Sequence, residues 1–345
     1  MNYTAVRRGF DQYQHSEVRF DQNTHSVWYY MKASPRPCFS RSLLDEIVSF
    51  QASLRSMATN QQSDDRIDFL VLASGIPNIF NLGGDLNLFK KLIYSKDRPG
   101  LVEYATLCID VLYHNVIHLD QPITSIALVK GSALGGGLEA ALSCDVIVAE
   151  KDVKMGFPEI LFNLFPGMGA YSLLSRKLDS ARARKIMLSG KLYDAKELYD
   201  MGVVDYLADI GQGEKSVAEH IKRHNKSKKG YDGIRKVVER VNPLSYDELK
   251  DITEIWVDTA LKLEDKDIRM MDRLVRSQDR LYQSASSSEE RRVDAVNKDI
   301  DNLKFKGVER RNPVSISMPI EKRRPYLHSV RIDSGKKKTE EQDPE

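Results

Sequence analysis

Three consecutive glycines (135–137) stand between an apolar run and a single acid, Glu139, in the stretch GSALGGGLEAALSCD (131–145). Glycine costs a helix or a strand about 1 kcal/mol relative to alanine, so a run of three requires an explanation. A strand is expected to end near Lys130, and residues 138–143 have helix-forming character. The first N–H groups of a helix lack acceptors and favour negative charge, so this join predicts an oxyanion site. The same glycines also fit a plain tight connection.

A second glycine pair, Gly83 and Gly84, follows another apolar run in IFNLGGDLNLF (79–89). Two strand-to-helix joins can each direct one N–H group at the same thioester carbonyl oxygen as it becomes an enolate. Loss of one such donor typically lowers the rate by about 100- to 1,000-fold. The alternative interpretation is a turn in which Asp85 caps a helix.

A second acid, Glu159, follows Pro158 and lies among apolar residues in MGFPEILFNLFPGMG. Carboxylic acids in apolar surroundings have raised pKa values and exchange protons near neutral pH. Glu139 also lies among apolar residues, so the two acids can each perform one of the two proton transfers of a reaction. One removes a proton next to the carbonyl and the other protonates a leaving hydroxyl. A glutamate considered alone is more often a surface or salt-bridged residue.

The composition favours no charged partner. The chain has 345 residues, 41% of them hydrophobic, and a formal net charge of +2, so it lacks the basic field that nucleic-acid binders show. Its three cysteines are far apart, which fits a reducing compartment better than a disulfide framework. No apolar run approaches the roughly 20 residues of a membrane span, and no signal peptide is visible. We expect a cytoplasmic protein without membrane insertion.

The histidines predict no metal site. The seven of them are scattered, and His114 and His118, four residues apart, have no nearby set of cysteine or acid partners with metal-ligand spacing. We interpret this pair as residues on a helix face.

The order of expected elements predicts an α/β fold. Residues 25–33, 66–74 and 123–131 have the strand-favouring composition, and the last two are continuous apolar runs typical of strands buried on both faces. A helical pattern over 101–119 separates them, and 145–157 is a third strand-like region after it. Alternation of this kind is typical of layered α/β structures.

The two ends of the chain differ from this core. Residues 1–24 form a polar lead-in, and from about residue 215 the chain becomes helical and highly charged. Low hydrophobicity with dense charge over 285–345 predicts a disordered or loosely attached tail. The pattern of this tail also permits contact with an acidic partner.

Taken together, the strings NLGGDLNLF, IALVKGSALGGGLEAALSCDVIVAE, MGFPEILFNLFPGMGA and LSGKLYDAKELYDMGVVD resemble the crotonase, or enoyl-CoA hydratase/isomerase, superfamily. The resemblance covers residues 25–210 in order and spacing. A narrower similarity is to the bacterial diffusible-signal-factor synthases of the Rpf quorum-sensing system, because PGMGAYS departs from the PGxGGTQRL pattern of ordinary hydratases. The C-terminal string ITEIWVDTALKLEDKDIRMMDRLVRSQ also resembles that branch.

This resemblance implies a spiral of ββα units over 25–210 and a helical region over 211–284 that covers the site and assists assembly into a trimer-based homo-oligomer. Carried over position by position, Gly84 and Gly136 match the backbone donors of the oxyanion hole, and Glu139 and Glu159 match the catalytic acids. The sequence does not show which glutamate is the acid and which the base.

The implied chemistry is dehydration of a 3-hydroxyacyl thioester, carried on the phosphopantetheine of acyl carrier protein, followed by hydrolysis. The product is a cis-2-unsaturated fatty-acid signal, and no other cofactor or metal is implied. The narrower branch also implies binding to the receiver domain of a sensor kinase. We expect Trp256, Met270 and Leu274 to line an acyl pocket, although apolar positions at this spacing usually pack in a core.

Two alternatives remain at the level of sequence. The first is an enoyl-CoA hydratase or isomerase of fatty-acid metabolism, which has the same two glutamates and takes coenzyme A. The second is a non-catalytic protein that uses the same fold to bind a partner. Retention of both acids, Glu139 and Glu159, favours an enzyme.

Overall fold

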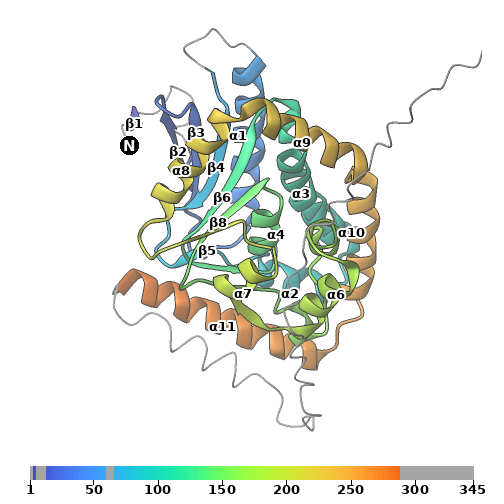
Figure 1. Cartoon of the computed structure of the whole chain (residues 1–345). Coiled ribbons are helices and arrows are strands. Elements are labelled where there is room, and N and C mark those ends of the chain that lie inside the picture. The colour runs from blue at the N-terminus through green and yellow to red at the C-terminus, as the bar shows by residue number, and fades with distance from the viewer. Residues whose placement is uncertain (1–2, 5–12, 60–65, 288–345) are drawn as a thin grey trace, which may run out of the picture. The chain divides into compact units, whose positions relative to one another are not determined.

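Two β-sheets with helices packed on them make up residues 3–4, 13–59 and 66–287, the part of the chain that this computed structural model describes (Figure 1). These residues all lie within one compact unit, residues 1–304. The unit therefore includes both the expected core region (25–210) and the expected helical region (211–284).

The larger sheet has seven strands in the order β1-β2-β3-β4-β6-β8-β11. The first three are paired antiparallel, and from β3 onwards every neighbouring pair is parallel. All six residues of β3 and of β6 are buried, which explains their continuous apolar composition. The strands are β1 (Tyr3–Thr4), β2 (Ser16–Asp21), β3 (Ser26–Met31), β4 (Phe69–Ser74), β6 (Thr124–Val129), β8 (Val146–Glu150) and β11 (Tyr206–Ala208).

The smaller sheet has four three-residue strands in the order β10-β9-β7-β5. They are β5 (Ile79–Asn81), β7 (Ser132–Leu134), β9 (Lys154–Gly156) and β10 (Leu192–Asp194). Each of β4, β6 and β8 in the larger sheet is followed by β5, β7 or β9 in the smaller one and then by helix. This repeated order confirms the expected ββα units and places three strand-to-helix joins at the small sheet.

The helices include those expected from the sequence, and the expected helical region 211–284 contains α8, α9, α10 and most of α11. Ser40 caps α1, because its hydroxyl accepts a 3.2 Å hydrogen bond from the Leu43 N–H group. The α-helices are α1 (Arg41–Thr59), α2 (Leu86–Tyr94), α3 (Arg98–Val116), α4 (Gly136–Leu142), α5 (Ala170–Lys177), α6 (Ser180–Ser189), α7 (Ala195–Asp200), α8 (Gly213–Lys226), α9 (Lys228–Val241), α10 (Tyr246–Ala260) and α11 (Asp265–Ser287), with single 3₁₀ turns η2 (His118–Asp120) and η3 (Glu159–Phe162).

The sequence-based expectations need correction at two places. The polar lead-in contains β2, which pairs antiparallel with β3 because its alternating residues bury one face on that strand. The stretch between Lys130 and the glycines is a short strand, β7, and not only a turn. The expected disordered tail, apart from the end of α11, lies outside the described residues.

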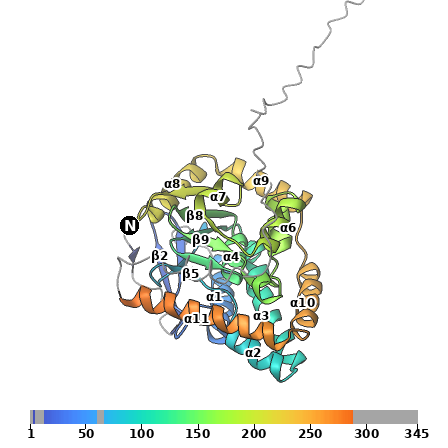
Figure 2. The same ribbon diagram turned by 90° about the horizontal axis from the view of Figure 1, so that it is seen from below.

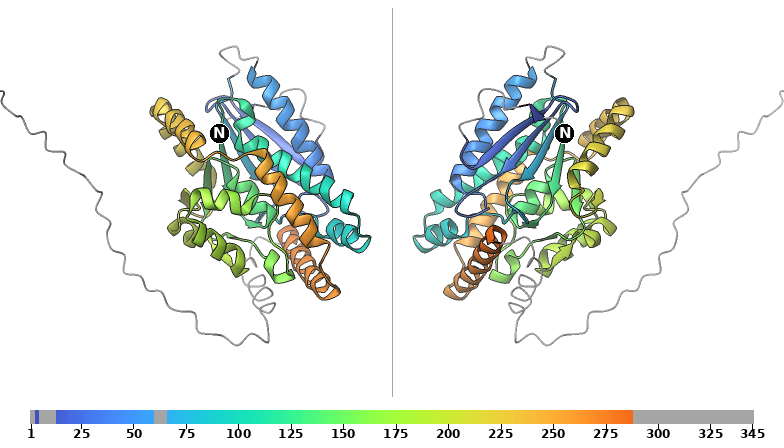
Figure 3. Two further views of the ribbon diagram at one scale, coloured as in Figure 1. Left: turned by 90° about the vertical axis from the view of Figure 1, so that its right-hand side faces the viewer. Right: turned by 90° about the vertical axis from the view of Figure 1, so that its left-hand side faces the viewer.

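The last two helices pack on the core from different sides. Helix α10 lies along α3, and α11 contacts α2 and η3, as Figure 2 shows from below. Helices α8 and α9 form one edge of the fold in Figure 3. Helix α9 has no buried residue, whereas α10 buries five.

Candidate active site

A cavity of about 50 Å³ brings together both glycine segments and both acids that the sequence singled out. Gly84, Gly136, Glu139 and Glu159 all line it, although they come from three segments: the loop before α2, helix α4 and the turn η3. Aromatic and apolar side chains make up much of the remaining wall. The other lining residues are Leu82, Leu86, Phe89, Tyr104, Ala105, Cys108, Gly135, Pro158, Phe162, Leu164, Phe165, Pro166, Gly167, Met168, Trp256, Leu274 and Gln278.

Each glycine of the triplet makes room for a different neighbour. A Cβ on Gly135, whose φ is +52°, would lie 2.1 Å from the Glu159 Oε1 atom. A Cβ on Gly136 would lie 2.7 Å from the Met168 Sδ atom, and one on Gly137 would lie 2.1 Å from the Asn81 carbonyl oxygen. The triplet therefore lies where three other segments approach the backbone too closely for a side chain. This explains the use of three glycines despite their cost in stability.

Two backbone N–H groups point to the expected oxyanion hole. Gly136 is the first residue of α4, so its N–H group has no intrahelical acceptor. Within the described part of the chain, neither this N–H group nor that of Gly84 donates a hydrogen bond to a protein acceptor. The two segments also touch, since a Cβ on Gly83 would lie 3.1 Å from the Gly136 nitrogen. Two N–H groups without protein acceptors therefore lie in segments that touch, as the expected oxyanion hole requires.

Glu139 is held in place by the start of α5. The residue is 1% exposed, and its Oε1 atom accepts hydrogen bonds from the N–H groups of Met168 (2.8 Å) and Ala170 (2.9 Å). Burial raises the pKa of Glu139 to about 8, and these two hydrogen bonds act in the opposite direction by stabilising the carboxylate.

Glu159 begins the turn η3, and among the described residues the backbone donor that favours its carboxylate is its own N–H group. The residue as a whole is half-buried, yet its Oε2 atom is fully buried and has no hydrogen-bond partner among the described residues. Burial, and then the neighbouring charge of Glu139, raise the pKa of Glu159 to about 8. Both carboxyl groups therefore favour the protonated form near neutral pH, and Glu139 has the additional N–H donors from Met168 and Ala170 that favour its carboxylate.

The three expected pocket residues do not all reach this cavity. Trp256 of α10 and Leu274 of α11 line it, and the Trp256 ring packs against Phe89 with 4.9 Å between centroids. Met270 does not line it and packs, half-buried, against the hydrophobic core instead. Leu274 and Met270 are one turn apart on α11, and only the later turn reaches the site.

Several lining residues were not predicted from sequence. Tyr104 and Cys108 lie on the expected covering helix α3, and Gln278 lies on α11. Their places on helices expected to cover the core could have indicated contact with the site. Their residue types did not, because Tyr, Cys and Gln also occur as ordinary core or surface residues. The structure confirms that Asp85 caps a helix, because its side chain accepts hydrogen bonds from the N–H groups of Asn87 and Leu88 at the start of α2. This role is compatible with a role of Gly84 in the oxyanion hole.

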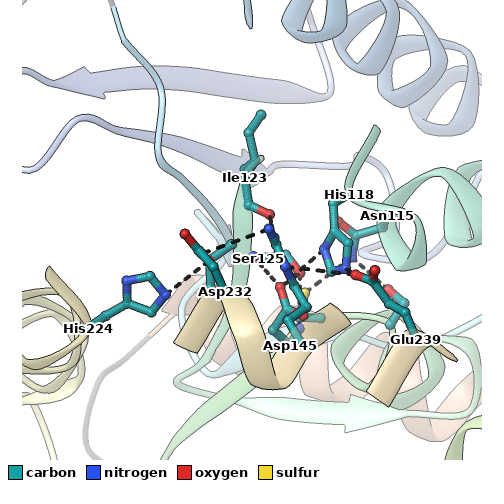
Figure 4. A network of polar contacts seen from close by, with 12 residues as sticks. Asn115, His118, Ile123, Ser125, Asp145, His224, Asp232 and Glu239 are labelled. Carbon is teal, nitrogen blue, oxygen red and sulfur yellow. Dashed lines mark hydrogen bonds and ion pairs between the residues drawn. The ribbon is translucent and has the colours of Figure 1, made fainter. Parts of the chain in front are cut away.

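His118 does not lie on a helix face, contrary to the sequence-based interpretation. It begins the 3₁₀ turn η2, and Figure 4 shows it between two acids. Its Nδ1 atom lies 3.3 Å from Asp145 and its Nε2 atom 3.2 Å from Glu239. The sequence hid both partners because they are 27 or more positions away along the chain. Across residues 13–59 and 66–287, no group of three His, Cys, Asp or Glu side chains is arranged to hold a metal ion.

Membrane-spanning helices are also absent from the described residues: none combines sufficient length with sufficient apolar character.

Comparison with known proteins identifies related sequences and folds. The sequence model of the enoyl-CoA hydratase/isomerase family matches residues 38–252, more than half of the chain. Human mitochondrial methylglutaconyl-CoA hydratase is 30% identical over 151 residues, 44% of this chain and 42% of that protein. An enoyl-CoA isomerase/hydratase of Mycosarcoma maydis is 30% identical over 50% of this chain and 61% of its own length. The chain thus spans about half the length of the curated relatives it matches.

Solved structures show the same fold at lower sequence identity. Enoyl-CoA hydratase from Bacillus halodurans superposes with a TM-score of 0.63 at 18% identity, covering 75% of this chain and 99% of that one. Pseudomonas aeruginosa DspI superposes with a TM-score of 0.54 at 23% identity, covering 73% and 98%. These likenesses confirm the mixed α/β architecture expected from the sequence.

Proposed function

Because the chain belongs to the enoyl-CoA hydratase/isomerase family, we propose that it adds or removes water across the C2–C3 bond of an acyl thioester. One observation carries the proposal: Glu139, Glu159 and the N–H groups of Gly84 and Gly136 line one cavity. The two N–H groups hold the thioester oxygen as negative charge develops on it. The two carboxyl groups exchange the protons at C2 and at the C3 oxygen.

The proton balance follows from the environments of the two acids. With the proton on Glu159 and the charge on Glu139, the pair is set for hydration. Glu139 takes a proton from the water that attacks C3, and Glu159 gives its proton to C2. Dehydration is the reverse: Glu159 removes the C2 proton and protonated Glu139 releases the C3 hydroxyl as water. One proton shared by the pair serves both directions.

Within this chemistry, the proposed substrate is a 3-hydroxyacyl group on acyl carrier protein and the product is a free cis-2-unsaturated fatty acid that serves as a quorum-sensing signal. Two of the segments that resemble signal synthases support this. Residues 166–172 supply the two N–H groups that hold Glu139, and α11 supplies Leu274 and Gln278 to the cavity wall. The departures from the ordinary hydratase pattern therefore lie at the site itself.

The thioesterase step uses the groups that dehydration leaves behind. After water is released, Glu159 carries the C2 proton and Glu139 is a carboxylate. Glu139 then takes a proton from the water that attacks the thioester carbon, and Glu159 protonates the departing thiolate. The carbon–sulfur bond breaks, an acid and a thiol result, and the shared proton returns to the pair.

The second candidate is an enoyl-CoA hydratase or isomerase. The names of the matched relatives favour it, since they describe hydratases and isomerases of coenzyme A thioesters. It requires the same four groups and omits hydrolysis. Binding of a kinase receiver domain remains a prediction from the sequence resemblance, and a cytoplasmic location remains a prediction from the composition.

Incubation with 3-hydroxydodecanoyl-acyl carrier protein, followed by mass spectrometry for free cis-2-dodecenoic acid, tests the synthase. We expect product from the wild type and a loss of at least about 100-fold in Glu139→Gln and in Glu159→Gln, because each removes one proton-transfer group. Hydration of crotonyl-CoA without acid release would favour the hydratase. Inactivity in both assays would leave the partner-binding alternative.

A matched control is available on β8. Glu150 is also buried, and its Oε1 atom accepts a hydrogen bond from the Gly213 N–H group (3.1 Å) outside the cavity. Glu150→Gln keeps an acceptor there and should retain wild-type turnover. Equal losses in all three variants would point to misfolding and would contradict the assignment of the acids.

A further inference from the structure

Two side chains bracket Gly84, the residue whose N–H group forms one side of the oxyanion hole. The Asn81 Oδ1 atom accepts a hydrogen bond from the Gly83 N–H group at 2.8 Å. The Tyr104 hydroxyl accepts one from the Asp85 N–H group at 3.1 Å. The N–H groups immediately before and after Gly84 are therefore both fixed by side chains, and the one between them is left for a ligand.

Tyr104 is well placed to be rigid. It lies on α3, is 1% exposed, and its ring meets Phe89 edge-on with 5.2 Å between centroids. Burial raises the pKa of Tyr104 well above its ordinary value, so the hydroxyl stays protonated. It is therefore both a donor and an acceptor at any pH at which the protein is assayed.

The Tyr104 hydroxyl also closes a ring of hydrogen bonds around the loop. It donates to the carbonyl oxygen of Phe39, whose own N–H group donates to the Gly83 carbonyl at 2.8 Å. One hydroxyl thus joins the strand-like segment at Phe39 to the peptide after Gly84. Gly83 has a φ of +92°, a conformation that glycine adopts without strain, so the loop can turn here between these hydrogen bonds.

We propose that Tyr104, assisted by Asn81, is a positioning residue that holds the Gly84 N–H group on the thioester oxygen. The inference rests on the proposed acyl-thioester chemistry and extends it to residues outside the catalytic pair. Oxyanion donors act only within about 2.7–3.1 Å of the oxygen, and a displacement of about 1 Å can cost about 100-fold in rate. A donor that is less firmly held should lower the reaction rate less than the complete loss of that donor.

Tyr104→Phe is the direct test, because it removes one hydroxyl and preserves the ring. With the thioester that the wild type turns over, we expect kcat to fall about 10-fold and KM to change less than about 2-fold. A 2,4-dienoyl-CoA thioester gives a second readout, since its absorption band moves to longer wavelength when its carbonyl oxygen is polarised. This red shift should be smaller in the variant at saturating ligand.

Tyr246→Phe is the matched control. This variant also removes a hydroxyl that is hydrogen-bonded to a residue of α3, because the Tyr246 hydroxyl donates to the Asp110 carboxylate at 2.7 Å. Tyr246 does not line the cavity. It should keep both kcat and the red shift. Asn81→Ala, which frees the other side of Gly84, should reproduce the loss of red shift if the bracket acts as described.

The outcomes separate the two proposals. A wild type that neither turns over thioesters nor shifts the dienoyl band overturns the proposed function itself. A wild type that does both, with Tyr104→Phe and Asn81→Ala unchanged, overturns the positioning role alone. Equal losses in Tyr104→Phe and Tyr246→Phe overturn it too, because they would show a general effect of removing a hydroxyl.

Discussion

At the scale of single residues, the carboxyl of Glu159 fills the space that any side chain at position 135 would need. Gly135→Ala would bring a Cβ to 2.1 Å from Glu159 Oε1 at a φ of +52°. Gly202→Ala is the control, because Gly202 also has a positive φ (+85°) but a Cβ there would meet no atom within 4 Å. We expect Gly202→Ala to cost only the backbone strain, about 1 kcal/mol, and Gly135→Ala to cost more and to abolish turnover.

Thermal unfolding and turnover measured on both variants check this prediction. Equal destabilisation of the two would show that backbone strain alone explains the glycine at 135.

The raised pKa values also predict how stability depends on pH. Folded Glu159 retains its proton up to about pH 8, whereas its ordinary pKa is 4.5. The folded state therefore binds more protons between these values, so the contribution to stability is complete below pH 4.5 and is lost as the pH rises through about 8. Glu159→Gln cannot ionise, so its free energy of unfolding relative to wild type should rise with pH, by at most about 1.4 kcal/mol per pH unit.

Chemical unfolding at pH 5, 7 and 8.5 measures this difference. A difference that stays constant over this range would contradict the raised pKa. Glu150→Gln, with an acid outside the cavity, provides the comparison for loss of a buried carboxyl as such.

The sequence predicted the two candidate catalytic acids, but it did not predict the geometry of their surroundings. Two glutamates in apolar company and two glycine runs were visible in the sequence, and the structure brings all of them to one cavity. The different surroundings of the two acids were not visible, because the donors to Glu139 come from Met168 and Ala170, about 30 positions away.

At the scale of elements, α11 is fastened over the site by ion pairs. Lys90 pairs with Asp272, and Arg36 pairs with Asp279 at 2.7 Å, all partly buried. Between these pairs on α11 lies Leu274, which lines the cavity. At about 50 Å³ the cavity is far below the roughly 300 Å³ typical of small-molecule sites, so an acyl chain can enter only when part of this wall moves.

Asp272→Asn with Asp279→Asn should therefore loosen the wall and ease entry of the acyl chain. Each pair is expected to contribute up to about 1 kcal/mol, so removing both should lower KM by up to about 30-fold with a smaller change in kcat. Steady-state kinetics test this, with Asp200→Asn, which breaks an exposed Lys196 pair on α7, as the control. An unchanged KM would show that these ion pairs do not hold the wall.

The sequence predicted long elements well and short ones poorly. Continuous apolar runs marked β4 and β6, and helical spacing marked α3. The three-residue strands of the small sheet are too short to show periodicity. They form because the neighbouring strands pair with them, which is information from distant parts of the chain.

At the scale of the whole molecule, α9 has an apolar face that nothing covers among the residues described. Its residues Ile234, Val237, Val238 and Val241 are 55–77% exposed and recur at helical spacing. Polar contacts attach the helix to the core: Glu239 to His118, and Arg235 to the carbonyl of Ile123 at 2.7 Å (Figure 4). An apolar stripe of this kind is typical of an interaction surface, and we propose it as the contact between copies of the chain in the homo-oligomer that the sequence resemblance implies.

We therefore predict that Val237→Asp with Val241→Asp lowers the oligomeric state of the protein. Burying two charges in an interface costs several kcal/mol, enough to dissociate subunits at micromolar concentration. Sedimentation analysis measures the mass. Ile210→Asp changes an equally exposed apolar residue away from α9 and should leave the mass unchanged. Retention of the wild-type mass in the double variant would place the assembly surface elsewhere.

The amphipathic pattern of α9 was present in the sequence, but a pattern shows that a face is apolar and not what covers it. For the same reason, the fold class and its helical C-terminal region were predictable, whereas the attachment of α9 through His118 was not. That contact joins residues 121 positions apart.

The hydrogen bond from Gln278 to the carbonyl oxygen of Leu82, 3.1 Å long, joins residues 196 positions apart. Leu82 immediately precedes the two glycines of the oxyanion loop, so one wall of the site is made by the last helix that the structure describes. During synthesis on the ribosome, the two acids and the glycine joins emerge long before α11. A nascent chain therefore carries the two acids before it carries their cover, and the cavity is complete only after α11 has been synthesised.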